Sequence, residues 1–293
     1  MEFSQLSDEE NQILATPQTG DIILVDGNSK LSDSLILAQK TIYSKCQSSH
    51  VELMIADGAI LHATGDQGVH LAFLFDELKT CKPNWRVMRH KKIINQENFD
   101  NFSTQFTYFI NQTYNKGFMG NGNESSSFCS ELVAKCYEKV GFSIFEQRPS
   151  KVAPAHFDKI FDSIDENSDW VDVTDDYKKY IDLITNKDDL RWINRFAYAT
   201  LKTGLFKRSL LAPYRESSFA AMYEMAKELG SSKMLEVLEQ SRDVLKNKRN
   251  LSFWNEQDYN FGLRAAPDVN ILDDYSKIHH QIYEHMMEAL KED

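Results

Sequence analysis

The segment of residues 49–63 constrains the fold more than any other part of the chain. It consists of two apolar runs that flank an Asp57-Gly58 pair. Apolar runs of this length around Asp-Gly are typical of two antiparallel strands joined by a tight turn. Each predicted strand carries one histidine, His50 on the first and His62 on the second, so the two imidazoles are candidates for one shared site.

The length of the turn decides whether the two histidines share a face of the sheet. A two-residue turn places His50 and His62 on opposite faces, because side chains alternate along a strand. A three-residue turn over residues 56–58, with Gly58 left-handed and bulged, pairs Glu52 with His62. His50 and His62 then become diagonal neighbours about 7–8 Å apart. We expect this second register, since only this one lets both rings serve a single site.

A second segment, residues 128–132, reads Phe-Cys-Ser-Glu-Leu and predicts a helix that opens with a cysteine. Unpaired N–H groups at a helix N-terminus favour the thiolate, and the N–H of Cys129 can donate to an oxyanion. A thiol nucleophile needs an imidazole to take its proton and a third polar group to orient that imidazole. We therefore predict Cys129 as nucleophile, with His50 and His62 supplying the base and the orienting group. The alternative for Cys129 is a structural role, as a small apolar residue on a buried helix face. For Cys136 we adopt this structural interpretation.

Three motifs carry a resemblance to a known family: Gly-Asp-Ile-Ile-Leu at residues 20–24, Ser-His-Val at 49–51 and Phe-Cys-Ser-Glu-Leu-Val at 128–133. They resemble the circularly permuted NlpC/P60 papain-like superfamily, and within it the bacterial YiiX/YebB-like amidase group, whose members place the histidine before the cysteine. The resemblance covers roughly residues 15–175.

The resemblance implies a cysteine hydrolase or acyltransferase that works through an acyl-thioester on Cys129, with His50 as base and His62 as the third polar residue. Many bacterial members carry glutamate at this third position, whereas the lecithin–retinol acyltransferase-like branch carries a second histidine. The implied substrate is therefore a small molecule, a peptide or a lipid-acyl compound. No metal and no organic cofactor are implied.

The remaining segments predict an α+β domain in which a small antiparallel sheet packs on the cysteine helix, followed by an all-α region. We divide the chain into an N-terminal arm (1–19), the catalytic domain (20–176) and a helical C-terminal region (177–293). Further strands are expected at 20–27, 69–73, 85–89 and 170–173. Helices are expected at 30–45, 96–115, 178–184, 188–206, 216–229, 231–247 and 270–291.

Two weaker candidates have structural interpretations. Glu131 follows the nucleophile closely, and we expect it to cap the helix or to form an ion pair there. His279, His280 and His285 lie near the C-terminus without a spaced set of carboxylate or cysteine ligands, so we predict no metal site from them.

The composition of the chain disfavours several classes of function. Acidic residues outnumber basic ones by 44 to 33, for a net charge of -11, which disfavours nucleic-acid binding. The four cysteines are too sparse for a disulfide framework. The chain has neither a signal-peptide pattern nor an apolar run of membrane-spanning length, so we expect a cytoplasmic protein, with export by a specialised secretion route left open.

Residues 190–215 form a basic and aromatic island in this acidic chain. One interpretation is an amphipathic helix packed on its neighbours, and the other is a surface for peripheral contact with anionic lipid. The alternative to an enzyme is a non-catalytic binding module, in which the papain-like fold is a relic and the helical region binds a partner.

Overall fold

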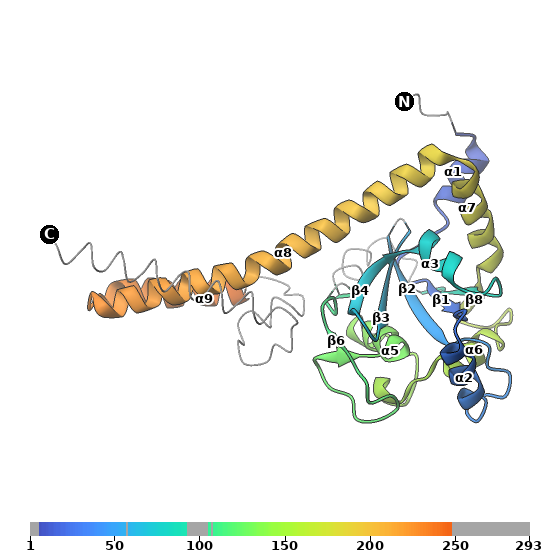
Figure 1. The fold of residues 1–293 in the computed structure, drawn as a ribbon, viewed down its shortest axis with the longest axis horizontal. Helices are drawn as coiled ribbons and strands as arrows, with labels where there is room; N and C mark the ends of the chain where they lie inside the picture. The colour runs from blue at the N-terminus through green and yellow to red at the C-terminus, as the bar shows by residue number, and fades with distance from the viewer. Residues whose placement is uncertain (1–5, 57, 93–104, 107, 248–293) are drawn as a thin grey trace. The chain divides into compact units, whose positions relative to one another are not determined.

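Figure 1 shows the fold of the chain in a computed structural model, which describes residues 6–56, 58–92, 105–106 and 108–247. The chain divides into two compact units, residues 1–202 and 203–293. This division lies downstream of the boundary that we expected at residue 176. The first unit contains the sheet, and the described part of the second is helical.

Six strands of the first unit form one antiparallel sheet in the order β4-β3-β2-β1-β5-β8. All four residues of β1 are buried, as in a strand from the middle of a covered sheet. The strands that we expected are all present, and the predicted antiparallel sheet is confirmed. Their bounds are β1 (Ile22–Val25), β2 (His50–Ala56), β3 (Ala59–Thr64), β4 (Gly68–Phe73), β5 (Arg86–His90) and β8 (Trp170–Asp172).

The hairpin of β2 and β3 has the expected register. Leu53 pairs with Leu61, so the next position along the ladder sets Glu52 opposite His62. His50, two residues before Glu52, then shares a face of the sheet with His62. The juxtaposition of the two histidines that we predicted from the register is therefore confirmed.

The turn of this hairpin differs from the three-residue turn that we expected. Ala56 pairs with Ala59, which leaves only residues 57–58 between the two strands. The pairing shifts between Met54 and Ala56, where a β-bulge adds one residue to β2. Gly58 has a φ of 76°, in the left-handed region that the turn needs. The bulge, and not the turn, therefore brings both histidines to one face.

Helices pack against this sheet (Figure 1). Helix α5, which begins at Cys129, contacts β2 and β3, so the sheet packs on the predicted nucleophile helix. The helices that begin in the first unit are α1 (Asp8–Leu14), α2 (Lys30–Gln39), α3 (Leu74–Thr80), α5 (Cys129–Lys139), α6 (Pro154–Phe161), α7 (Thr174–Asn186) and α8 (Asp188–Glu228), with a short 3-10 turn at Pro149–Lys151.

Helix α7 belongs to the core of the first unit. Its Tyr177 packs in one buried cluster with Ile23 and Val25 of β1. Ile23 pairs with Glu52, and Val25 pairs with His50. Because directly paired residues project to the same side of a sheet, the side chains of Glu52 and His50 lie on the face that carries this cluster.

The helix that we expected over residues 96–115 is wrong at its C-terminal end. Residues 108–111 form a turn, and Asn111 has a φ of 72°, a left-handed conformation that does not continue a helix. The next residues form β6 (Thr113–Tyr114), which pairs in parallel with β7 (Ser126–Ser127). Residues 96–104 of this expected helix lie outside the described residues.

The second unit contains the end of α8 and helix α9 (Ser232–Asn247). The helices that we expected at 188–206 and 216–229 are one helix, because helical backbone continues through residues 207–215. Gly230 lies between α8 and α9 with a φ of 62°. The helix expected at 270–291 lies outside the described residues. No helix in the described part of the chain combines the length and the apolar character needed to cross a membrane.

Two basic side chains of the segment 190–202 form ion pairs within the first unit. Arg195 bonds both carboxylate oxygens of Asp76, at 2.6 and 2.8 Å, and Arg191 pairs with Asp188. These pairs support the interpretation of an amphipathic helix that packs on its neighbours.

Candidate active site

A row of three histidines crosses the sheet from β2 to β4. His50 Nε2 lies 3.2 Å from His62 Nδ1, and His62 Nε2 lies 3.0 Å from His70 Nε2. His70 Nδ1 in turn lies 3.0 Å from the carbonyl oxygen of Gly68. His70 is opposite His62 in the β3–β4 ladder, and our sequence reasoning missed it. The alternation of β4, combined with the β3–β4 register, was the signal that could have identified it.

The Gly68 carbonyl fixes the direction of every hydrogen bond in this row when the rings are neutral. A carbonyl only accepts, so His70 Nδ1 carries a proton and His70 Nε2 is an acceptor. His62 Nε2 must then donate to His70, which leaves His62 Nδ1 as an acceptor. His50 Nε2 therefore donates to His62, and the lone pair of His50 lies on Nδ1. This is the atom that a base would use.

Burial keeps the three rings neutral. It lowers the pKa of His50 to about 3 and the pKa of His70 to about 4, and the neighbouring His62 adds to both shifts. Burial also lowers the pKa of His62. Near neutral pH the row therefore carries lone pairs and no positive charge.

A buried carboxyl group lies beside this row. Glu52 Oε1 is 3.6 Å from His62 Nδ1 and 4.0 Å from His50 Nε2, and the side chain of Glu52 is fully buried. Neither carboxyl oxygen has a hydrogen-bond partner among the described residues. Burial raises the pKa of Glu52 to about 8. Such an unpartnered buried group is costly, and it points to a site built for more than packing.

Cys129 is the first residue of α5, as predicted, and its side chain is buried. Burial raises the pKa of its thiol to about 11. Backbone groups of Val51 and Ser130 act in the opposite direction, because they hydrogen-bond to the thiolate. The resting cysteine is therefore a thiol whose conjugate base already has hydrogen-bond donors in place.

The structure brings the three predicted site residues to one region but does not join all of them. His50 and His62 are hydrogen-bonded, whereas no hydrogen bond between described residues links Cys129 to either ring. The sulfur instead meets the backbone of Val51, the residue that follows His50. Side chains alternate along β2, so the His50 ring extends from the face opposite to the Val51 side chain.

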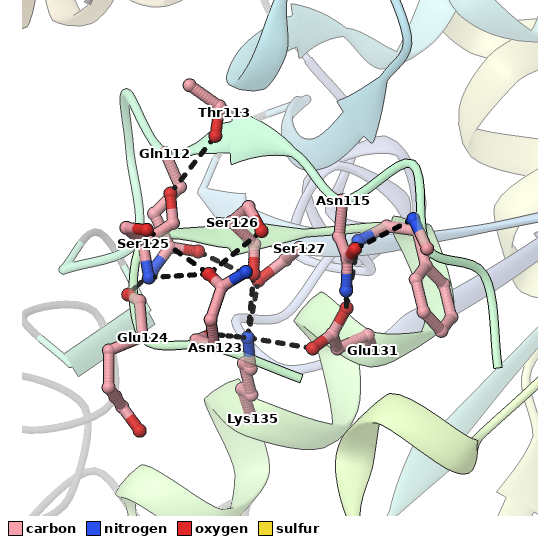
Figure 2. A network of polar contacts seen from close by, with 12 residues as sticks. Gln112, Thr113, Asn115, Asn123, Glu124, Ser125, Ser126, Ser127, Glu131 and Lys135 are labelled. Atoms are coloured by element: carbon pink, nitrogen blue, oxygen red, sulfur yellow. Dashed lines mark hydrogen bonds and ion pairs between the residues drawn. The ribbon is translucent and has the colours of Figure 1, made fainter. Parts of the chain in front are cut away.

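The segment that leads into α5 is held by a network of polar contacts, which Figure 2 shows. The Asn115 side-chain amide donates to Glu131 Oε2 at 2.9 Å, and the Phe128 N–H donates to the same oxygen at 3.3 Å. Lys135 pairs with Glu131 Oε1 at 2.9 Å. Glu131 therefore caps the N-terminus of α5 and forms an ion pair within the same helix, as predicted. These contacts fix the start of α5 next to Cys129.

A buried carboxylate of α6 fixes the approach to His50. Asp158 accepts hydrogen bonds from the N–H groups of Gln47 and Ser48, at 2.7 and 2.9 Å, and from the Ser48 hydroxyl at 2.6 Å. It also pairs with Arg86 of β5. Because these contacts involve the two residues next to Ser49-His50, they set where β2 begins.

Comparisons with known proteins give the family context of this site. Residues 16–153 match the model of a family described as permuted papain-like amidase enzymes, YaeF/YiiX, C92 family. The chain is also similar to the crystal structure of metalloprotein yiiX from Escherichia coli O157:H7, at 22% identity and a TM-score of 0.39 over 45% of this chain and 72% of that one. None of the curated proteins matches the chain. The predicted resemblance is therefore confirmed over residues 16–153, where the chain carries the sequence pattern of the permuted papain-like amidases.

Proposed function

We propose that the protein is a cysteine amidase in which Cys129 attacks an amide carbonyl, His50 accepts the thiol proton and His62 orients His50. The match to an amidase family supports an enzyme. The observation that carries the residue assignment is the junction of α5 with β2. There the thiol at the helix N-terminus meets the backbone next to His50, whose ring is hydrogen-bonded to His62.

The first step needs the His50 ring to turn its Nδ1 atom towards the sulfur. His50 is the first residue of β2 and its side chain is 22% exposed, which leaves room for this rotation. Catalytic hydrogen bonds are often long or unmade before substrate binds. Because the thiol and the imidazole are both neutral at rest, the proton moves to Nδ1 as the sulfur attacks.

The attack forms a bond between Cys129 Sγ and the carbonyl carbon, and the negative charge moves to the carbonyl oxygen. The N–H of Cys129 at the start of α5 is a donor for this oxyanion. The amine leaves with the proton from His50, and an acyl-thioester remains. Water, deprotonated by His50, then releases the acid and restores the thiol.

Acyl transfer shares every step up to the acceptor, in which an amine or alcohol replaces water. The acyl group of a peptide, a small amide or a lipid would react in the same way. The product formed in water alone separates the two outcomes, because a hydrolase releases free acid, whereas a transferase keeps the acyl-thioester until an acceptor amine or alcohol is added.

Turnover of a panel of fluorogenic acyl amides tests the proposal, with peptidyl, short acyl and long acyl groups. We expect Cys129→Ser and His50→Gln to lose at least about a hundredfold in kcat/KM. The matched control is Cys81→Ser, because Cys81 is a free cysteine of the same unit and is not one of the proposed catalytic residues. Equal rates in wild type and Cys129→Ser would contradict the proposal.

A further inference from the structure

We propose that His50, His62 and Glu52 form a binding site for a divalent transition-metal ion of the zinc class. One ligand atom from each residue lies within 4.8 Å of the other two. The three separations are 3.2, 3.6 and 4.0 Å. Two ligands that are each about 2.1 Å from one ion at the tetrahedral angle lie about 3.4 Å apart. The spacing is therefore close to that of a ligand set around one ion.

The carboxyl group of Glu52 provides an independent observation. The Glu52 side chain is 0% exposed, so water does not reach it. Both of its carboxyl oxygens also lack a hydrogen-bond partner among the described residues. A buried carboxylate without a partner is strongly disfavoured, and such groups are normally paired or bound to a metal. A cation between Glu52 and the two rings removes this cost.

The residues behind the site have the arrangement that metal sites use. A histidine ligand usually donates its second ring N–H to another group, which fixes the nitrogen that faces the metal. Here His62 Nε2 donates to His70, and His70 donates to the Gly68 carbonyl. This chain directs the lone pair of His62 Nδ1 at the space shared with Glu52 and His50.

The donor set selects the class of metal. Two imidazole nitrogens and one carboxylate suit zinc and its neighbours, whereas magnesium and calcium prefer oxygen ligands alone. An ion can enter past His50, whose side chain is 22% exposed, while those of Glu52 and His62 are buried.

Metal binding and the proposed chemistry exclude each other, and this consequence rests on the proposed function. The metal takes the lone pair of His50 Nε2, so the ring proton moves from Nε2 to Nδ1. The atom that would accept the thiol proton of Cys129 is then already protonated. The metal-loaded protein is therefore a resting form that chelation activates.

The direct test measures metal binding by the full-length chain. Chain stripped with a chelator is titrated with zinc chloride against a chromophoric zinc indicator, and folding is monitored by circular dichroism. We expect about one tightly bound zinc ion per chain and much weaker binding of magnesium. Glu52→Gln and His62→Gln should each weaken zinc binding about a hundredfold or more.

Two variants serve as controls. His90→Gln removes a histidine from β5, outside the cluster, and should bind zinc like the wild type. Cys129→Ala should also keep the affinity, which shows that no thiolate holds the ion and separates the site from the proposed enzyme activity. Equal affinity in folded Glu52→Gln and wild type, or no zinc bound by folded wild type, would overturn the proposal.

Discussion

The reactivity of Cys129 towards iodoacetamide should depend on pH in a way that the structure specifies. Burial raises the pKa of this thiol to about 11. At pH 7 the thiolate fraction is then on the order of 10⁻⁴, compared with about 3% for an exposed cysteine of pKa 8.5. The thiolate population of Cys129 is therefore about 300-fold lower than that of an exposed cysteine.

Part of this deficit is recovered, because a more basic thiolate is a stronger nucleophile. A Brønsted coefficient of about 0.45 over 2.5 pKa units increases the intrinsic rate about 13-fold. Cys129 should therefore react about 20-fold more slowly at pH 7 than a free low-molecular-weight thiol. Its rate should rise about tenfold per pH unit up to about pH 10, since the acid form dominates below the pKa.

The assay follows the alkylated peptide that contains Cys129 by mass spectrometry, from pH 6 to pH 10. The pH at which the rate levels off should be the same in His50→Gln as in the wild type, because no hydrogen bond joins the described His50 ring to the sulfur in the resting state. A plateau below pH 7 that disappears in His50→Gln would refute the reasoning, since it would show a preformed thiolate–imidazolium pair.

Three further outcomes are expected. Asp158→Asn should lower the free energy of unfolding in urea by about 3 kcal/mol, because it removes the charge from a buried ion pair; an unchanged midpoint would contradict this. Gly68→Ala should lower the free energy of unfolding by at least about 2 kcal/mol, since Gly68 has a φ of 67° and an added Cβ would lie 2.3 Å from the Gln112 carbonyl oxygen. Gly65→Ala, where a Cβ meets no atom within 4 Å, is its control and should be neutral within about 0.5 kcal/mol. His70→Phe should lower kcat about 10- to 100-fold with little change in KM, because the His62 ring is then no longer held in one tautomer. Circular dichroism must show that this variant is folded. An unchanged kcat would refute the orienting role of His70.

The sequence predicts most of the first unit because its strands have strong apolar patterns between turn residues. The register of β2 and β3 was also predictable, since only one register sets His50 and His62 on one face. The route to that register was not, because a β-bulge leaves no signal in an apolar run such as residues 53–56. The same alternation was available for His70, but the pattern of β4 alone does not show which strand lies beside it.

Tertiary contacts explain the other differences. The helical pattern from residue 177 onwards predicts a second, helical region, yet Tyr177 and Tyr180 of α7 pack in one buried cluster with residues of the sheet. The phenylalanine spacing before residue 112 favours a helix, but Asn111 adopts a left-handed conformation and the chain then pairs as β6. Glu52 was overlooked as a site residue, because an isolated glutamate in an apolar strand does not reveal that it is buried without a partner.

The central claim is that Cys129 forms an acyl-thioester with the help of His50. The most direct measurement is the intact mass of the full-length chain after brief incubation with an activated acyl ester and acid quench, followed by peptide mapping. The account predicts one added acyl group, located on Cys129, which is absent from Cys129→Ser and strongly reduced in His50→Gln. An acyl group distributed over Cys81 and other residues, or equal labelling of wild type and His50→Gln, would contradict it.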